Sequence, residues 1–165
     1  MPDLVPLAHA DPVALEALLD AAFGADRRRR TVYRVRAGLQ PIADLSFALI
    51  EDGELVGSIQ CWPVQLDTDG GGSVPLVMVG PVAVAPPRQG TGIGRRLMER
   101  AIAAAGADAP LMLMGDPDYY RRFGFGAART ARWRLPGPFE PHRLLARGAV
   151  PDAAGMIAAR TTALV

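Results

Sequence analysis

The chain has 165 residues, half of them hydrophobic, and 18 basic side chains almost balance 17 acidic ones. This length is typical of one domain whose hydrophobic core needs neither metal nor disulfide. A single cysteine, Cys61, excludes a disulfide-stapled scaffold. The net charge of +1 and the absence of long apolar runs argue against nucleic-acid and membrane partners. Since the first residues also lack a signal-peptide pattern, we expect a cytoplasmic protein.

The N-terminal quarter predicts a strand followed by two helices. The strand covers residues 4–7, and the first helix begins at Pro12, is capped by Asp11 and ends at Gly24. Residues 27–38 predict a second helix with six arginines. We expect these arginines on a solvated face, with an acidic acceptor as the alternative interpretation.

A run of strands follows. Residues 45–50 and 55–66 predict a hairpin around Asp52 and Gly53. Residues 74–84 predict a long apolar strand interrupted by Gly80-Pro81. Because proline cannot donate to a β-ladder, we expect a bulge or a splayed pairing at this point.

The C-terminal half alternates helices and strands. A helix is predicted over residues 92–105, a short buried strand over 109–114, a helical turn over 118–123 and a strand over 127–135. The segment 136–165 has no clear period and is left unassigned. The pattern predicts a mixed α/β architecture in a single domain, 1–165.

A glycine-rich turn joins the long strand to the following helix. The segment from Val82 to Met98 reads VAVAPPRQGTGIGRRLM, and Gln89–Gly94 opens the helix. Without side chains, glycines let backbone N–H groups converge on a phosphate, and the helix N-terminus adds its own donors and dipole. Arg88, Arg95 and Arg96 add positive charge. The turn therefore predicts a diphosphate-binding site.

Two nucleotide-binding motifs compete with this interpretation. A Walker loop requires lysine, and the chain contains none. A dinucleotide fingerprint fits Gly90 and Gly92, although Arg95 stands at its third glycine position. Asp116 lies where a ribose-binding acid would stand, so a dinucleotide-dependent oxidoreductase is kept as a minor alternative.

Two segments together resemble the GCN5-related N-acetyltransferases. The family signature Q/R-x-x-G-x-G/A is matched by Gln89, Gly92 and Gly94. In YYRRFGF, a tyrosine precedes a Gly-Phe pair by four residues, as in the family's second recurrent segment; Tyr120 and Gly124-Phe125 match it. The two segments occur in family order and spacing and cover residues 80–126.

The resemblance implies an acyl-CoA N-acyltransferase fold with a central, mostly antiparallel sheet, splayed at its fourth strand and flanked by helices. It implies transfer from acetyl-CoA, without a metal, to a small-molecule or peptide amine by direct attack in a ternary complex. A homodimer is also conceivable. The residues expected to bind the coenzyme are Val82, Ala83, Val84, Arg88, Gln89, Gly90, Thr91, Gly92, Ile93, Gly94 and Arg95.

By the same resemblance, Tyr120 is the general acid that protonates the departing thiolate, with Tyr119 as the fallback. A phenol of pKa near 10 can protonate a thiolate whose conjugate acid has a pKa of about 8.5. The structural alternative is that both tyrosines pack with Phe123 and Phe125.

The sequence does not identify a general base. Many relatives carry a glutamate on the split strand, but residues 73–84 contain no carboxylate. Asp116 is a weak candidate and could equally cap the next helical turn. The missing carboxylate also allows a second function, a non-catalytic acyl-CoA sensor or assembly module. Cys61 is expected to be a buried small hydrophobe, and the two histidines lack metal-ligand spacing.

Overall fold

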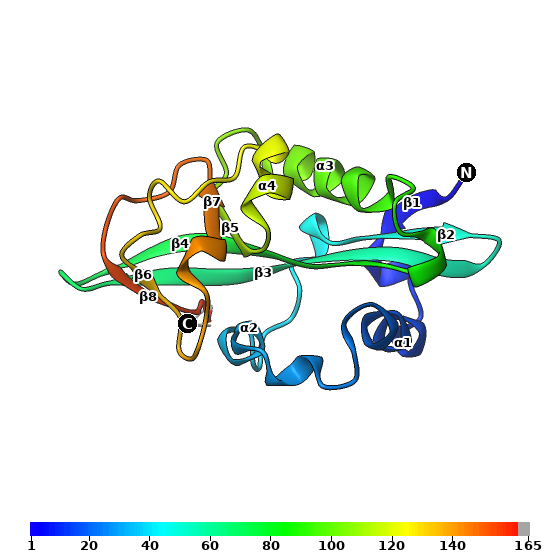
Figure 1. Cartoon of the computed structure of the whole chain (residues 1–165), viewed down its shortest axis with the longest axis horizontal. Coiled ribbons are helices and arrows are strands. Elements are labelled where there is room, and N and C mark those ends of the chain that lie inside the picture. Colours follow the sequence, from blue (N-terminus) through cyan, green and yellow to red (C-terminus); the bar gives the residue numbers. More distant parts are fainter. Residues whose placement is uncertain (162–165) are drawn as a thin grey trace. The chain divides into compact units, whose positions relative to one another are not determined.

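The computed structural model describes residues 1–161. The chain forms two compact units, each built from three segments. The first comprises Met1–Arg29, Pro41–Cys61 and Gly80–Gly106; the second comprises Arg30–Gln40, Trp62–Val79 and the chain from Ala107. Two long strands, β3 and β4, contribute to both units (Figure 1).

The described residues contain eight strands in one hydrogen-bonded sheet. Their order is β1-β2-β3-β4-β5-β7, and β8 pairs with both β3 and β6. Four of the recorded pairings are antiparallel, whereas β4–β5 and β6–β8 are parallel, which confirms the predicted mostly antiparallel sheet. The strands are β1 (Asp3–Pro6), β2 (Phe47–Glu51), β3 (Glu54–Thr68), β4 (Ser73–Val84), β5 (Leu111–Met114), β6 (Trp133–Arg134), β7 (Leu144–Arg147) and β8 (Gly155–Ala159).

Four α-helices and several 3₁₀ turns accompany these strands within residues 1–161. The helices are α1 (Pro12–Phe23), α2 (Thr31–Val35), α3 (Ile93–Ala105) and α4 (Pro117–Tyr120). The 3₁₀ turns are Leu7–His9, Arg27–Arg29, Ala43–Leu45, Pro86–Arg88, Arg121–Phe123 and Pro141–Arg143. None of the helices in this part of the chain is long and apolar enough to span a membrane.

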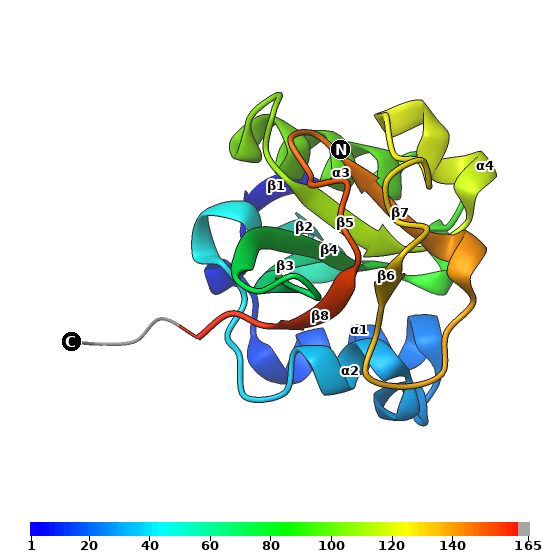
Figure 2. The same ribbon diagram turned by 90° about the vertical axis from the view of Figure 1, so that its left-hand side faces the viewer.

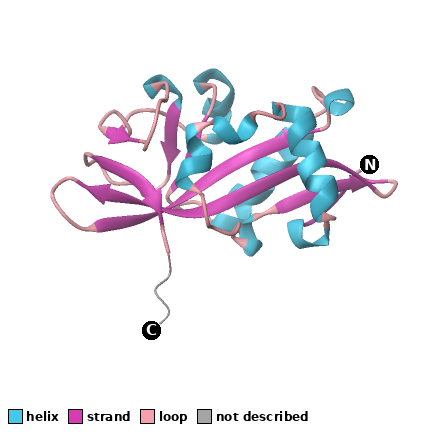
Figure 3. Ribbon diagram, turned by 90° about the horizontal axis from the view of Figure 1, so that it is seen from below, coloured by secondary structure: helices cyan, strands magenta, loops and turns pink. Residues whose placement is uncertain are grey.

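In the first unit, α1 and α3 lie on opposite sides of the strands (Figure 1). The N-cap Asp11 accepts a hydrogen bond from the Val13 N–H at 3.2 Å, and α1 ends at Gly24 with φ +93°, as predicted. Side chains of α1 pack against Ala83 on β4. Seen from below, cyan helices lie in front of the magenta strands (Figure 3).

The predicted hairpin between β2 and β3 is present. Asp52 and Gly53 adopt positive φ angles of 51° and 78°, as a tight two-residue turn requires. A register shift between Leu49 and Ile50 places one extra residue on β3. This bulge reverses which alternate residues of β3 face α1.

In the second unit, β8 lies between β3 and β6 (Figure 2). One core joins Val35 of α2 to Trp133 of β6 and to inward side chains of β3, β4, β5, β7 and β8. Both β7 and β8 come from the C-terminal segment that the sequence left unassigned. Long-range pairing therefore supplies the order that its local pattern lacks.

The predicted second helix over residues 27–38 was wrong in extent. The segment forms a 3₁₀ turn, Arg27–Arg29, and then the five-residue α2. The expected solvated face is also wrong for two arginines, because Arg27 is 2% exposed and Arg36 is 7% exposed. Arg36 stacks on the rings of Tyr33 and Trp62, 3.8 and 4.6 Å from their centroids.

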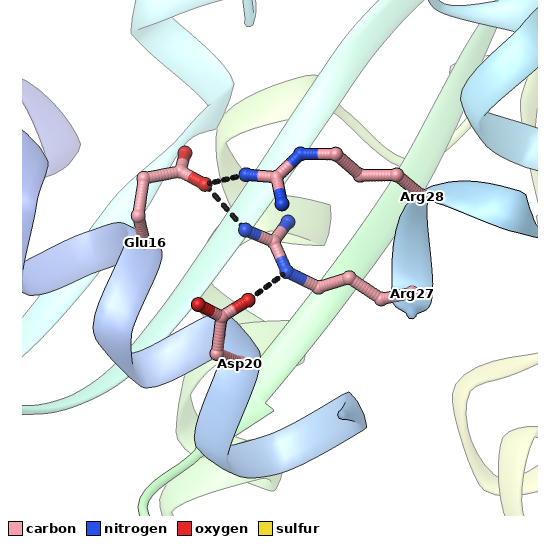
Figure 4. Close-up of polar contacts among 4 residues, drawn as sticks. All are labelled: Glu16, Asp20, Arg27 and Arg28. Carbon is pink, nitrogen blue, oxygen red and sulfur yellow. Dashed lines mark hydrogen bonds and ion pairs between the residues drawn. The ribbon is translucent and has the colours of Figure 1, made fainter. Parts of the chain in front are cut away.

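Arg27 is held by two carboxylates of α1. Its guanidinium donates to Asp20 at 2.9 Å and to Glu16, and Arg28 also donates to Glu16 at 2.7 Å (Figure 4). The carboxylates are about half exposed. This cluster fixes the turn after α1, and the arginines that it engages serve the fold.

The predicted strand over residues 127–135 was wrong in extent, because only Trp133–Arg134 form a strand there. Residues 127–132 form turns because Thr130 redirects the backbone. Its hydroxyl donates to the Leu144 carbonyl at 2.7 Å, and its own carbonyl accepts from the Trp133 N–H at 3.0 Å. Local β-propensity is overridden by these contacts.

Candidate active site

The glycine-rich turn of the first unit connects the end of β4 to α3. After the 3₁₀ turn Pro86–Arg88, Gly90 and Gly92 adopt positive φ angles of 81° and 86°. A Cβ atom built on either glycine would meet no other atom within 4 Å. The loop thus presents open backbone on one side, and its conformation is one that L-residues with side chains seldom adopt.

Helix α3 starts directly behind this backbone. Gly92 is its N-cap, and the Arg96 N–H donates to the Gly92 carbonyl at 3.1 Å. The amides of Ile93 and Gly94 come before that bond, so helix geometry gives them no intrahelical acceptor. A thirteen-residue helix adds the positive end of its dipole at the same place. The arrangement is suited to a bound diphosphate.

Two side-chain hydrogen bonds brace the turn. Gln89 donates from Nε2 to the Val84 carbonyl at 3.4 Å, and the Thr91 hydroxyl donates to the Arg88 carbonyl. The Arg88 N–H also donates to Ala85 at 2.8 Å. Signature residue Gln89 therefore ties the turn to the end of β4.

The three arginines beside the turn have protein partners. Arg88 pairs with Glu51 of the hairpin, Arg95 with Glu99 at 2.7 Å, and Arg96 with the Pro2 carbonyl at 3.1 Å. The hydrogen bond from Arg88, aided by its charge, lowers the pKa of Glu51 from its usual range. The three guanidinium groups are therefore each engaged by other parts of the protein in this conformation.

The strand that leads into the turn changes its pairing at the predicted position. The parallel register of β4 with β5 consists of Val77↔Leu111 and Met78↔Met112, so it ends before Gly80. Gly80 has φ +124° and precedes a cis peptide bond to Pro81. Beyond it, Val82 and Val84 are half-buried, whereas Ala83 is fully buried against α1.

In the second unit, Tyr120 lies at the end of α4 among other aromatic rings. Its ring centroid is 4.9 Å from that of Tyr119 and 6.3 Å from those of Phe123 and Phe125. A Cβ on Gly115 would come within 2.3 Å of the Tyr120 ring, so this glycine makes room for it. Burial, followed by the neighbouring Tyr119, raises the pKa of Tyr120. The phenol is therefore protonated at neutral pH.

Tyr119 has a different environment. Its ring lies 5.7 Å from that of Phe123, and the Arg122 guanidinium stacks 4.5 Å from its centroid. Both tyrosines thus pack with phenylalanines, as the structural alternative predicted. This packing fixes the positions of the two rings. It does not assign a catalytic role to either hydroxyl.

Asp116 is a helix cap. Its carboxylate accepts from the Asp118 N–H at 3.0 Å, and its carbonyl accepts from the Tyr120 N–H at 3.0 Å. Of the two roles considered for this residue, the structure supports capping.

Neither a reactive thiol nor a metal-binding cluster is found among the described residues. Burial raises the pKa of Cys61 to about 12, so its thiol is protonated at neutral pH. Within residues 1–161, no group of three or more His, Cys, Asp or Glu side chains could hold a metal ion.

Comparison with known proteins decides the family. Residues 6–128 match the model of the acetyltransferase (GNAT) domain. The chain belongs to the GNAT acetyltransferase family. It is 28% identical over 144 residues to the uncharacterized N-acetyltransferase YhbS of Escherichia coli K12, which covers 81% of this chain and 82% of that protein. This GNAT acetyltransferase is thus an acyltransferase, and the dinucleotide alternative is not supported.

Solved structures agree on the fold. A GNAT acetyltransferase from Brucella melitensis, crystallised with acetyl-CoA, is 29% identical and has a TM-score of 0.66 over 97% of this chain and 96% of its own. The E. coli YhbS structure in complex with CoA has a TM-score of 0.69 at 22% identity, over 96% of this chain and 89% of its own.

Sequence reasoning missed two polar residues on β3. Ser58 and Gln60 are buried, yet Ser58 Oγ and Gln60 Oε1 have no hydrogen-bond partner within the described chain. They stand in an apolar stretch that reads as ordinary core strand, so only the three-dimensional structure could single them out.

Proposed function

We propose that this protein is an acetyl-CoA-dependent N-acetyltransferase that transfers the acetyl group to a small-molecule or peptide amine by direct attack. The open, positive-φ backbone at Gly90 and Gly92, in front of the N-terminus of α3, is the observation that carries the proposal. The relatives from B. melitensis and E. coli, crystallised with acetyl-CoA and CoA, support the same donor.

The backbone of the turn has the main part in donor binding. Amides from Gln89 to Gly94 would hold the two phosphates, and Arg88 and Arg95 would contribute through charge. The pantetheine arm is itself a chain of amides, so the backbone of Val82 and Val84 would pair with it as a strand pairs with an added strand. An amide in this segment would also stabilise the charge that develops on the thioester oxygen.

Tyr120 would donate the proton that the thiolate needs. Its raised pKa keeps the phenol protonated. With ordinary pKa values of about 10 and 8.5, transfer to a thiolate is uphill by roughly 1.5 units, and the proton that the attacking nitrogen loses would restore the phenol. Tyr119 would serve only if the Tyr120 hydroxyl does not reach the sulfur. No cysteine or serine is paired with a base for a covalent intermediate in the parts of the site described above, which supports direct attack.

The decisive experiment measures thiol release from acetyl-CoA across a panel of primary amines, beside the thermal shift given by CoA. Tyr120→Phe keeps the aromatic packing and removes one hydroxyl. We expect kcat to fall at least tenfold, with CoA affinity unchanged. Tyr119→Phe is the matched control and should retain wild-type kcat.

Three results would contradict the proposal in different ways. If millimolar CoA gives no thermal shift, the donor site is wrong. If CoA shifts the melting temperature but no amine releases thiol, the protein is an acyl-CoA sensor. If Tyr119→Phe loses activity and Tyr120→Phe does not, the acid is Tyr119. Sedimentation of the same preparation would test the homodimer.

A further inference from the structure

Strand β3 carries two buried polar side-chain atoms, Ser58 Oγ and Gln60 Oε1, that lack hydrogen-bond partners within the described residues. Ser58 is 0% exposed and Gln60 is 6% exposed, and neither Ser58 Oγ nor Gln60 Oε1 makes a hydrogen bond within residues 1–161. Folded proteins pair nearly all such groups, because an unpaired buried polar atom has lost its water without compensation. Gln65, further along the strand, shows the usual outcome, since its amide donates to Asp67 at 2.7 Å.

The two side chains point to the same face of the sheet. Residues two apart on a strand share a face of the sheet. Gly57 of β3 shows which residues of this strand belong to the opposite face. A Cβ on Gly57 would lie 2.6 Å from Ile93 and 3.1 Å from Leu97, so odd-numbered positions here face α3. Ser58 and Gln60 therefore face away from α3, toward the side of the sheet that α1 covers.

This face lies beside the segment proposed to meet the acetyl donor. The Ala85 N–H donates to the Val56 carbonyl at 2.9 Å, and the Ala83 carbonyl is 3.4 Å from a Cβ built on Gly57. Ser58 is thus one strand away from residues 82–84. On its other side, Ser58 is paired in register with Ala48, whose methyl side chain offers no hydrogen-bond partner to the hydroxyl.

The chemistry of the pair selects its ligand. An amide oxygen only accepts hydrogen bonds, so the partner of Gln60 Oε1 must be an N–H or O–H donor. Residues 57–66 and 73–84 contain no aspartate or glutamate. A buried site that offers neutral acceptors and no carboxylate favours an uncharged amine over an ammonium ion.

We propose that Ser58 and Gln60 bind the acceptor amine through its N–H groups and hold it in the neutral, nucleophilic form. The inference rests on the proposed acetyltransferase function and deepens it. The ammonium proton is left in bulk water on binding. The nitrogen then attacks the thioester carbon, so that the C–N bond forms and the C–S bond breaks. The nitrogen loses one proton in this step, and the departing thiolate gains one proton to become the thiol. No carboxylate base is required, which accounts for its absence from β4.

Two substitutions remove the acceptor atoms with little change in volume: Ser58→Ala and Gln60→Met. Each should raise the melting temperature of the ligand-free protein by about 2–5 °C, because it removes an unpaired buried polar atom. Each should also lower kcat/KM for the amine about tenfold, with acetyl-CoA affinity unchanged. The matched control is Thr130→Val: Thr130 is 3% exposed but donates to Leu144, so this variant should melt lower and keep its acceptor kcat/KM.

The outcomes separate this inference from the function on which it rests. If the wild-type protein releases no thiol with any amine, the proposed function itself fails. If it does turn over, unchanged acceptor kcat/KM in both β3 variants overturns the amine site. Lower melting temperatures in both, as in Thr130→Val, would show that an ordered water satisfies these atoms as part of the fold and would also overturn it.

Discussion

At Gly57, β3 lies close against the start of α3, and Gly57→Ala tests how tightly the helix behind the proposed donor site packs on the sheet. The new Cβ would lie 2.6 Å from Ile93 Cγ2 and 3.1 Å from Leu97 Cδ1. The first distance is well below carbon contact of about 3.5–4.0 Å. Since Ile93 is the first residue of α3, relief of the overlap must move the start of the helix.

Two opposing effects determine how much Gly57→Ala changes the free energy of unfolding. Alanine in a strand interior is favoured over glycine by roughly 0.5–1 kcal/mol. Overpacking a dense core costs typically about 1–3 kcal/mol. Because Ile93 is β-branched and stiff, the second effect should dominate, with a net loss of about 1–2 kcal/mol. For a chain of this length that lowers the melting temperature by roughly 2–8 °C.

Differential scanning calorimetry of the free protein and titration with CoA measure both consequences. We expect CoA affinity to fall with the displaced helix start. Gly70→Ala is the matched control, because a Cβ at that position meets nothing within 4 Å and needs no positive φ. If Gly57→Ala melts at or above the wild-type temperature and binds CoA equally well, the close seating of α3 is refuted.

Three further predictions follow from single contacts. Asp116→Ala should lower stability by about 1 kcal/mol through loss of the cap and change kcat less than twofold; a hundredfold loss of kcat would instead make Asp116 a base. Glu51→Gln should lower the melting temperature at pH 7. Arg88 lowers the pKa of Glu51 in the folded protein, so the ion pair stabilises the fold fully above about pH 4.5. This stabilisation is lost as the pH falls through the lower pKa that Glu51 has in the folded state. A difference in melting temperature between the variant and wild type that stays constant from pH 7 to pH 3 would contradict this prediction. Gly148→Ala should cost at least about 3 kcal/mol in urea unfolding, because its Cβ would lie 2.0 Å from the Ala109 carbonyl oxygen at φ +84°; a cost below about 1 kcal/mol would disprove that contact.

The parts of the fold that were predictable carry their own local signals. Asp11 and Gly24 bound α1 because a side-chain cap and a positive-φ glycine act within one turn of the backbone. The Asp52-Gly53 turn and the glycine-rich start of α3 are local in the same sense. The glycine-rich turn and the start of α3 could therefore be located from the sequence before any coordinates.

The parts that were missed depend on distant partners. Arg27 is buried because Glu16 and Asp20 come from another helix, and residues 127–132 turn because Thr130 finds a carbonyl on β7. A strand sequence also gives no sign that a serine hydroxyl will lack a partner. These features follow from tertiary contacts, which the hydrophobic periodicity of the sequence does not reveal.

The place of β8 in the sheet has a consequence for synthesis on the ribosome. The first unit ends at Gly106, so all its segments have been synthesised while about a third of the chain is still unmade. The far end of β3 receives β8 only when residues 155–159 emerge, through pairs from Val64↔Ala159 to Thr68↔Gly155. Until then that edge carries open backbone groups, which invite pairing with a neighbouring nascent chain. A stop codon before residue 155 would make this transient exposure permanent, so truncation there should yield insoluble protein even though every residue of the glycine-rich turn is present.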